Sequence, residues 1–390
     1  MSVTAPAGFV ANGVACGIKP SGDPDLSLVA TADGVAVPAA AVFTQNLVVA
    51  APVTTSRGHL LATGGRAAGV ILNSGNANAC TGEQGAADAA AMCAATAESL
   101  GCAADEVLVC STGLIGPTLP IDRITKAVPD LVAALGPSPV DAVRAAEAIM
   151  TTDTRPKQTA VRGDDFVIGG MAKGAAMLAP NMATMLAVLT TDAAVDAREL
   201  HATLAAGVFD SFNAMTIDGC TSTNDTVMIL ASGRAGAPAS LPAFRDAVAE
   251  ACLDLAMQMV GDAEGHTKVV KVRVTGAASD DEARRAARKV AESQLVKCSW
   301  YGKDPYWGRV ASDLGTAGVE LDVTALSIAY GGTVVSRGCV EVDHDRAAVV
   351  AHMEGEYLDL TCDLGVGSGA ARILTNDLTH AYVDENMGTS

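Results

Sequence analysis

Strand-like and helix-like segments alternate along the first third of the chain, and this alternation limits the fold more than any other feature. Signals for buried strands occupy residues 27–32 and 39–53 and the run AAGVILNSGNANACTG (67–82). An alanine-rich helix, GAADAAAMCAATAESLG (85–101), follows and is closed by glycine. Strands that alternate with helices predict an α/β protein. The 39 glycines and 3% aromatic content suit close packing of helices on sheets.

The length of 390 residues predicts roughly two to three domains. Helical signals return at 121–148, where Pro129 is expected to interrupt the helix, and at 194–209. An alternating strand, KVVKVRVTG (268–276), is followed by an abrupt shift to charged residues. This shift makes 276–281 the strongest candidate for a domain boundary.

The composition excludes several classes of protein. A formal charge of −18 without a Lys/Arg cluster argues against nucleic-acid binding and indicates a solvated, acidic surface. No apolar run reaches the length of a membrane span, and the N-terminus lacks the pattern of a secretory signal. The ten cysteines form no CxxC pair, which indicates reduced thiols in a cytoplasmic protein. Cys110 and Cys298 remain alternative nucleophiles, although no histidine lies near either in sequence.

Common site motifs are absent from the sequence. GVGSGA (365–370) has the glycines of a phosphate loop, but a strand pattern follows it where a helix N-terminus is needed. The six histidines show no metal-ligand spacing, EVDHD (341–345) is better explained as a solvated turn, and no GxSxG elbow occurs. We therefore predict no metal site and no ordinary serine hydrolase.

Two strands open into loops of small residues, in ILNSGNANACTG (71–82) and in STGLIGP (111–117). Backbone N–H groups in such loops are left uncovered and can point at a ligand. From the pattern alone, an ordinary turn is the simpler interpretation.

The almost uncharged stretch MLAPNMATMLAVLTTDA (177–193) has one threonine in its middle, Thr184. A threonine hydroxyl needs a base, and without a nearby histidine the α-amino group of the same residue can serve, once the preceding peptide bond is cut. The small residue Ala183 would leave the scissile carbonyl accessible. A buried strand threonine is the alternative, with the strand expected from Met185 to Leu189.

The motifs taken together resemble the ornithine acetyltransferase family, the glutamate N-acetyltransferases of arginine biosynthesis. The resemblance covers about residues 5–386, and its blocks occur in the order of that family. KGAAMLAPNMATML resembles the self-processing site of that family. Eight further blocks are ILNSGNANACTG, CSTGLIG, IMTTDTRPK, GGMAKG, IDGCTSTNDT, DAEGHTK, DPYWGR and DLTHAYV.

The resemblance implies self-cleavage between Ala183 and Thr184, which gives an α chain (1–183) and a β chain (184–390), with Thr184 as the nucleophile. Thr112 and Gly113 would form the oxyanion hole. Further residues are implied in substrate binding; they are Thr152, Lys173, Glu264, Asn386 and Ser390. Lys173 can hold a carboxylate as a point charge, and Glu264 can meet an ammonium group or the amine of Thr184.

The resemblance also implies the reaction. An acetyl group would pass from N2-acetylornithine to Thr184 and then to glutamate, without a metal or organic cofactor. Acetyl-CoA stays open as a further acetyl donor. The implied fold is a layered α/β sandwich of the self-processing N-terminal-nucleophile type, with a smaller C-terminal α/β domain from about 280–390. Two αβ pairs are expected to assemble as a cytoplasmic heterotetramer.

Two positions depart from the family pattern. Tyr306 stands in DPYWGR where asparagine is expected, and the tail after Asn386 is about one residue short, which leaves Ser390 or Thr389 to match the terminal hydroxyl residue. Two alternative functions stay open. An aminopeptidase or amidase of the same fold would use water as the acceptor, and a binding protein would leave Thr184 uncleaved.

Overall fold

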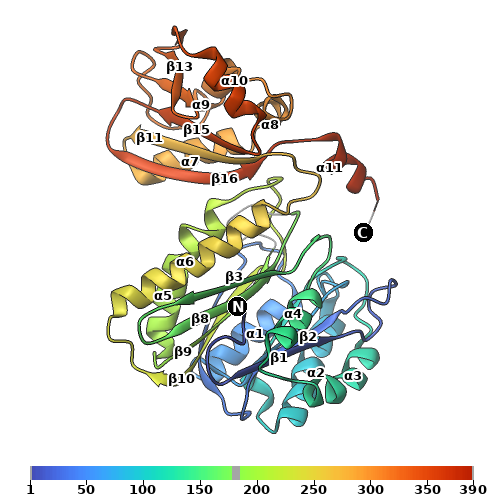
Figure 1. The fold of residues 1–390 in the computed structure, drawn as a ribbon. Helices are drawn as coiled ribbons and strands as arrows, with labels where there is room; N and C mark the ends of the chain where they lie inside the picture. The colour runs from blue at the N-terminus through green and yellow to red at the C-terminus, as the bar shows by residue number, and fades with distance from the viewer. Residues whose placement is uncertain (1, 178–184, 389–390) are drawn as a thin grey trace. The chain divides into compact units, whose positions relative to one another are not determined.

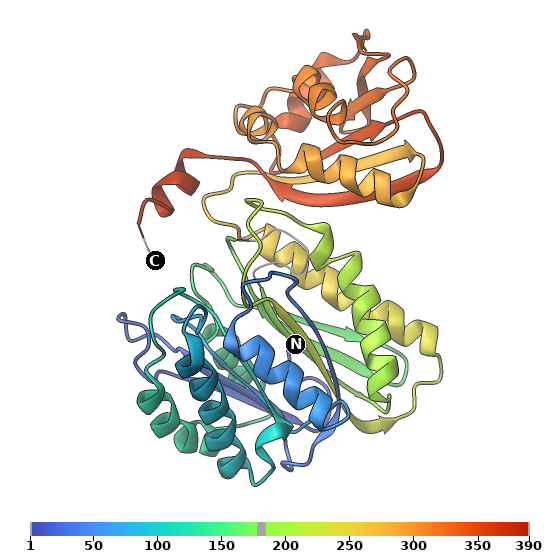
Figure 2. The same ribbon diagram turned by 180° about the vertical axis from the view of Figure 1, so that it is seen from behind.

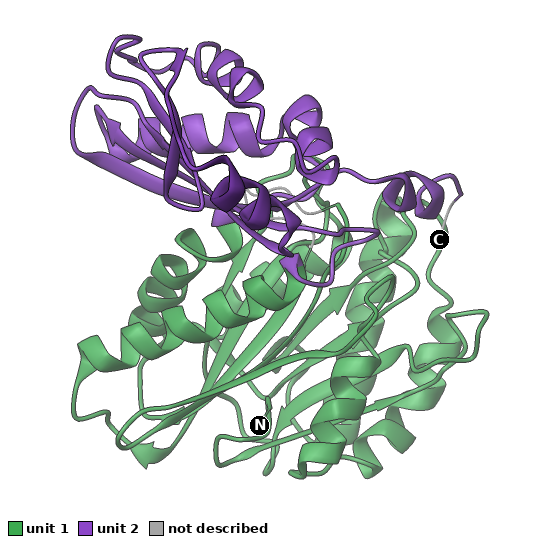
Figure 3. Ribbon diagram, turned by 45° about the horizontal axis from the view of Figure 1, so that its top comes forward, with its two compact units in different colours: residues 1–213, 220–259, 389–390 green, residues 214–219, 260–388 purple. Residues whose placement is uncertain are grey.

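The computed structural model describes residues 2–177 and 185–388. They form two compact units, shown in different colours in Figure 3. Unit 1 draws its residues from 1–213 and 220–259, and unit 2 from 214–219 and 260–388. The compositional break at 276–281 falls inside unit 2, between a strand and a helix.

Unit 1 contains two sheets. The first has the order β1-β2-β5-β6, and its strands are β1 (Phe9–Val14), β2 (Leu26–Thr31), β5 (Gly69–Asn73) and β6 (Val107–Ser111). The second has the order β4-β3-β10-β9-β8-β7, and its strands are β3 (Val37–Phe43), β4 (Arg66–Ala67), β7 (Lys157–Arg162), β8 (Val167–Lys173), β9 (Leu186–Ala193) and β10 (Thr226–Gly236). Most neighbours are antiparallel, but β5 pairs with β6, and β9 with β10, in parallel.

Helices cover the outer faces of both sheets, as Figures 1 and 2 show from opposite sides. The helices of unit 1 are α1 (Ala51–Ala62), α2 (Gly82–Leu100), α3 (Ile121–Ala133), α4 (Pro139–Glu147), α5 (Ala197–Phe209) and α6 (Leu241–Val260), with short 3₁₀ turns at Ala104–Glu106 and Phe212–Ala214. Helices α2 and α3 pack on the first sheet, and α5 packs on β3 of the second. Helix α1 lies along the edge strand β6, where the Ser56 hydroxyl accepts a hydrogen bond from Val109 N and donates one to Val109 O.

The strands are hydrophobic on both faces because each face is covered. In β5, Val70 and Leu72 point into the core between the two sheets, whereas Ile71 points toward α2 and α3. Strand β6 alternates in the same way, with Leu108 and Cys110 between the sheets. The unbroken apolar runs in the sequence thus have the composition of strands buried on both sides. The predicted α/β class and sandwich are confirmed.

Unit 2 is built on one six-stranded sheet, ordered β14-β13-β12-β15-β11-β16. Its strands are β11 (Val269–Ala277), β12 (Ser327–Tyr330), β13 (Thr333–Arg337), β14 (Val340–Glu341), β15 (Tyr357–Asp363) and β16 (Gly369–Asn376). Its helices are α7 (Asp280–Ala291), α8 (Gln294–Tyr301), α9 (Trp307–Leu314), α10 (Arg346–Glu354) and α11 (His380–Glu385). The alanines and Val290 of α7 meet the valines of β11 in a core that also encloses Trp300.

One local prediction is wrong. Pro129 does not interrupt its helix, because α3 runs unbroken from Ile121 to Ala133. The helical structure stops only after Ala133, and α4 begins after its N-cap Ser138. The apolar stripe of Ile124, Val128 and Leu131 is buried against the first sheet, and this burial outweighs the backbone bond that proline cannot make. Within residues 2–177 and 185–388, no helix has both the length and the apolarity to cross a bilayer.

Candidate active site

The loop after β6 is fixed by asparagine side chains. The Ser111 hydroxyl donates to Asn73 Oδ1 at 2.5 Å, and Asn73 Nδ2 donates to Asn76 O at 2.8 Å. From the loop before β10, Asn224 Nδ2 donates to the carbonyl oxygens of Ala77 and Ser111 at 2.6 and 2.9 Å. The two small-residue loops of the sequence therefore lie together, tied by one amide.

Thr112 and Gly113 lie in this loop and offer different hydrogen-bond donors to a ligand. The Thr112 amide donates to Asn73 O at 3.0 Å, so only its hydroxyl remains for a ligand. No acceptor for the Gly113 N–H lies in the described part of the chain. Gly113 has φ of 129°, and a Cβ there would lie 2.3 Å from Gly75 C. This close approach requires glycine and leaves one hydroxyl and one amide as donors for an oxyanion.

Lys173 ends β8 beside the same loop. Its side chain is buried, and Nζ donates to Thr112 Oγ1 at 3.2 Å and to Thr151 Oγ1 at 2.7 Å. The ammonium group thus contacts the loop that carries Gly113. A carboxylate bound to Lys173 would lie next to the candidate oxyanion donors.

Asp153 anchors the segment that follows α4. Its Oδ1 accepts from Lys157 Nζ at 2.6 Å and from the Gly174 amide at 2.7 Å, and its Oδ2 accepts from Thr151 N at 3.1 Å. Burial by itself would raise the pKa of Asp153, but Lys173, Lys157 and the Gly174 amide outweigh it and lower the pKa to about 2. The ionised Asp153 carboxylate therefore fixes two backbone amides near the Lys173 ammonium, those of Thr151 and Gly174.

Asp225, in the loop before β10, carries a second buried carboxyl group, which lies beside Met185, the residue that precedes β9. Asp225 Oδ1 accepts a hydrogen bond from Met185 N at 2.9 Å. Burial raises the pKa of Asp225 well above its ordinary value, although the Met185 amide and Lys173 act in the opposite direction. Lys173, Leu186 and Thr226 are register partners across β8, β9 and β10, so these groups gather at one end of the second sheet.

Three of the predicted site residues, Ala183, Thr184 and Ser390, lie outside the described residues. Thr152 is half-buried in the segment between Thr151 and Asp153. It is Thr151 whose hydroxyl meets Lys173. Cys110 is buried in the core between the sheets, and burial raises the pKa of its thiol to about 12, which is unsuited to a nucleophile.

Glu264 and Asn386 belong to unit 2 and contact each other. Asn386 Nδ2 donates to Glu264 Oε2 at 2.7 Å. Glu264 lines a cavity of about 140 Å³ together with residues of β16, α8 and α11. Lys297 also lines it, and burial lowers the pKa of this lysine to about 8 against the opposing effect of Asp218, Asp377 and Glu292.

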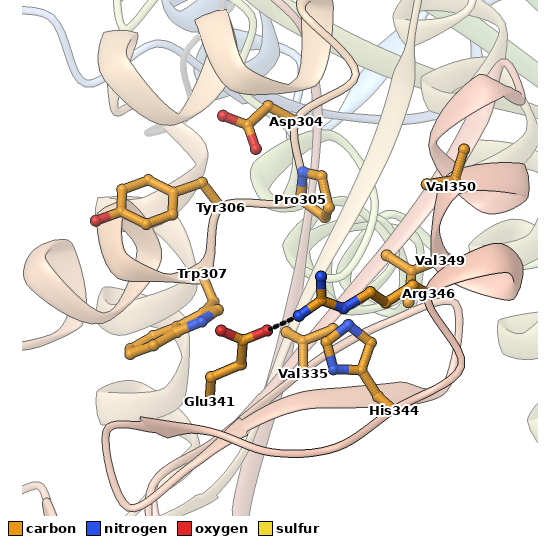
Figure 4. A pocket seen from close by; sticks show the side chains of 10 residues that line it. All are labelled: Asp304, Pro305, Tyr306, Trp307, Val335, Glu341, His344, Arg346, Val349 and Val350. Carbon is orange, nitrogen blue, oxygen red and sulfur yellow. Dashed lines mark hydrogen bonds and ion pairs between the residues drawn. The ribbon is translucent and has the colours of Figure 1, made fainter.

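A larger cavity of about 340 Å³ lies elsewhere in unit 2 (Figure 4). Tyr306 and Trp307 line one side, and the ion pair between Arg346 and Glu341 (3.0 Å) lines the other. Tyr306, the departure from the family pattern, is 53% exposed there. None of the described residues predicted for the site lines this cavity. Among the described residues, no three His, Cys, Asp or Glu side chains gather as metal ligands do.

The comparisons with known proteins identify the family. The ArgJ family matches residues 10–388. The chain belongs to the ArgJ family. It is 48% identical over 394 residues to the arginine biosynthesis bifunctional protein ArgJ of Mycobacterium bovis, a match that covers 100% of this chain and 96% of that protein. The ArgJ protein of Streptomyces avermitilis is 46% identical over 391 residues and is matched over 100% of both chains.

A solved ArgJ-related structure is also similar. It is the ornithine acetyltransferase of Mycobacterium tuberculosis complexed with ornithine, with 50% identity, coverage of 46% of this chain and 94% of that chain, and a TM-score of 0.44. The predicted resemblance is confirmed by the match to the ArgJ family.

The site of this ArgJ family member includes residues that the sequence analysis did not single out. Asp153, Lys157, Asn224 and Asp225 are buried and form hydrogen bonds there, and Thr151, which is exposed, contacts Lys173 through its hydroxyl. Two of them stand in the quoted block IDGCTSTNDT, where a polar loop enters a buried strand. That position is the available signal, because a buried carboxyl or amide there must find partners.

Proposed function

We propose that this chain is an acetyltransferase that moves the acetyl group of N2-acetylornithine to glutamate. The match to ArgJ proteins over the whole chain carries this proposal. The contact of Lys173 with Thr112 supports it, because it sets a cation for an α-carboxylate beside donors for an oxyanion.

The chain first cuts itself. Thr184 Oγ attacks the carbonyl carbon of Ala183, the C–N bond breaks, and water hydrolyses the resulting ester. This leaves a carboxylate on Ala183 and a free α-amino group on Thr184. Thr112 and Gly113 stabilise the oxyanion of the tetrahedral intermediate.

Acetyl transfer then proceeds in two steps. The α-amine of Thr184 removes the hydroxyl proton while Oγ attacks the acetyl carbonyl, and the proton passes to the ornithine amine that leaves. The amine of glutamate next attacks the acetyl ester and restores the hydroxyl. Lys173 holds the α-carboxylate of each amino acid in turn. We assign further roles in substrate binding to Thr152, Glu264, Asn386 and Ser390. No metal or organic cofactor takes part, and acetyl-CoA is a further donor to be tested.

The processed chains stay together as αβ pairs that assemble into a cytoplasmic heterotetramer. The proposal is tested with the purified protein, N-acetylornithine and glutamate. We expect a β fragment that begins at Thr184, by intact mass and N-terminal sequencing, and acetylglutamate formation that requires both substrates. Acetate release that is independent of glutamate would assign an amidase instead. An intact chain that binds ornithine without turnover would assign a binding protein.

A further inference from the structure

The two ends of helix α11 bind the same dipeptide, Glu264–Gly265. Thr379 is the N-cap of this helix and Asn386 is its C-cap. The Thr379 hydroxyl accepts a hydrogen bond from Tyr382 N at 3.1 Å and donates one to Gly265 O at 2.6 Å. Asn386 Nδ2 donates to Tyr382 O at 2.9 Å as well as to Glu264 Oε2. One cap of α11 therefore holds the backbone of the dipeptide, and the other holds its carboxylate.

Gly265 allows α11 to lie directly against the loop that carries Glu264. Glu264 and Gly265 are the middle residues of a turn in which His266 N donates to Ala263 O at 3.3 Å. Gly265 has a φ of 59°, and a Cβ there would lie 2.3 Å from Tyr382 N. A side chain at this position would therefore strain the turn and push α11 away from it.

A second set of hydrogen bonds joins the same two stretches of chain. Asp377 is 5% exposed, and its Oδ1 accepts from Thr267 N at 2.9 Å and from Lys268 N at 3.0 Å. Asn376 Nδ2 donates to Lys268 O at 3.0 Å. The sequence blocks DAEGHTK (262–268) and DLTHAYV (377–383) are thus far apart in the chain but packed against each other in unit 2.

Glu264 keeps one carboxylate oxygen for a ligand. The residue is 9% exposed and lines the cavity of about 140 Å³. Its Oε2 accepts from Asn386, whereas the described part of the chain makes no hydrogen bond to Oε1. A glutamate side chain has several rotatable bonds, and ordering it during binding reduces affinity. Holding the carboxylate in place beforehand avoids that loss.

We propose that Thr379 is a positioning residue that keeps the Glu264 carboxylate in the orientation that binds substrate. Its hydroxyl both starts α11 and ties the helix to Gly265, and α11 in turn presents Asn386 to Glu264. This inference rests on the proposed function, in which Glu264 and Asn386 bind the amino-acid substrates. Because the Thr379 hydroxyl is occupied by two protein partners, it acts on the substrate through Glu264 and not by direct contact.

The test uses the full-length variant Thr379→Val, in which a methyl group replaces the hydroxyl at nearly the same volume. We expect KM for N-acetylornithine, and Kd for ornithine measured by calorimetry, to rise about fivefold or more. We expect kcat to stay within about twofold of the wild type, because the acetyl group and its nucleophile are untouched. Hydrogen exchange of the α11 amides should become faster. Thr379→Ser keeps the hydroxyl and should restore KM, Kd and slow exchange.

Ser279→Ala is the matched control. Ser279 is the N-cap of α7 in the same unit and accepts from Glu282 N at 3.2 Å, but it follows the far end of β11 from Glu264. We expect this variant to lower the melting temperature, as Thr379→Val does, and to leave KM and Kd unchanged. If Thr379→Val does not fold, Gly265→Ala makes the same test, because it displaces α11 and should raise KM and Kd without a comparable loss of kcat.

The outcomes separate the two proposals. Faster exchange of α11 in Thr379→Val with unchanged KM and Kd would overturn the role of Thr379 and leave the proposed function standing. A loss of affinity of the same size in Ser279→Ala or in Thr379→Ser would also overturn it, since the Thr379 hydroxyl would then not be the cause. Wild type that binds ornithine but transfers no acetyl group would overturn the proposed function, and the ornithine Kd of the variants would still test Thr379. Wild type that does not bind ornithine would overturn both.

Discussion

Gly113 is the residue whose conformation most restricts the candidate oxyanion loop. We expect Gly113→Ala to lower the free energy of unfolding by about 1–3 kcal/mol, from strain at its positive φ, and kcat by about 100-fold. The methyl group would meet Gly75 C at 2.3 Å and Asn76 N at 2.4 Å and displace the amide donor. Urea denaturation and acetyl-transfer kinetics measure the two effects.

Gly116 in the same loop provides the control. Its φ is 106°, but no heavy atom lies within 4 Å of an added Cβ. Gly116→Ala should therefore show the strain without the loss of kcat. Equal kcat values for the two variants would mean that the Gly113 amide is not an oxyanion donor.

The lowered pKa of Asp153 predicts that the stability of the protein depends on pH. Its folded pKa of about 2 is below the unfolded value of 3.8, so the ionised form stabilises the fold above pH 3.8 and this stabilisation disappears as the pH falls toward 2. The difference in pKa corresponds to roughly 2–3 kcal/mol. We expect Asp153→Asn to cost about 3–5 kcal/mol at pH 7, because a neutral amide would face the buried Lys157, and to cost less near pH 2.

Urea denaturation at several pH values measures this dependence. Asp33 is the control, because its pair with Arg234 is about half exposed (48% and 54%) and exposed pairs contribute about 0–1 kcal/mol. Asp33→Asn should change stability little at any pH. A destabilisation by Asp153→Asn that is the same at pH 7 and pH 2 would contradict the assignment of an ionised Asp153.

At the scale of elements, Pro129 is an exposed proline inside α3 that the helix tolerates. Proline lacks the amide proton for the bond to the preceding turn, so we expect Pro129→Ala to stabilise the protein by about 1–3 kcal/mol. Pro139 stands at the first position of α4, where proline is favourable. Pro139→Ala should give no gain, and thermal unfolding of both variants checks the difference. A stabilisation by Pro139→Ala as large as that by Pro129→Ala would contradict this explanation.

Elements also bring the site together. Strands β8, β9 and β10 align Lys173, Leu186 and Thr226 in one row, and the loop before β10 reaches β6 through Asn224. We therefore expect Asn224→Ala to reduce kcat more than a peripheral substitution of equal destabilisation, since it frees the carbonyl of Ser111 next to Thr112. Asp192, near the far end of β9, accepts hydrogen bonds from Val167 N and Ala7 N, so comparison with Asp192→Asn at matched stability tests this.

At the scale of the whole molecule, the residues before and after position 184 share the second sheet of unit 1. Strands β9 and β10 of the second half lie between β3 and β8 of the first half. Separating the halves would break two rows of strand hydrogen bonds and open the core between the sheets. We expect the cleaved fragments to co-elute in size-exclusion chromatography and to separate only in denaturant. Fragments that separate in native buffer would contradict this.

The sequence by itself determined the α/β class, the positions of most strands and helices, and the family. Apolar runs such as GVILN and VLVCS carry the period and length of doubly covered strands, and eight ordered motifs carry the resemblance. These signals are local in the sequence, so they can be recognised without the three-dimensional structure. The helix around Pro129 is predicted with an interruption that the structure does not have, because burial of its apolar stripe overrides local propensity.

Only the tertiary structure decided how the site is held. Asp153, Asn224 and Asp225 look like ordinary loop polar residues in the sequence. Asn224 and Asp225 bind partners that are distant in the chain, Ser111 for Asn224 and Met185 for Asp225, and Asp153 binds Gly174 as well as its neighbours Thr151 and Lys157. Burial then sets the pKa of each carboxyl, lowered where lysines and amides surround Asp153 and raised where desolvation prevails at Asp225. These pKa shifts depend on neighbours in three dimensions, and the periodicity of the sequence does not predict them.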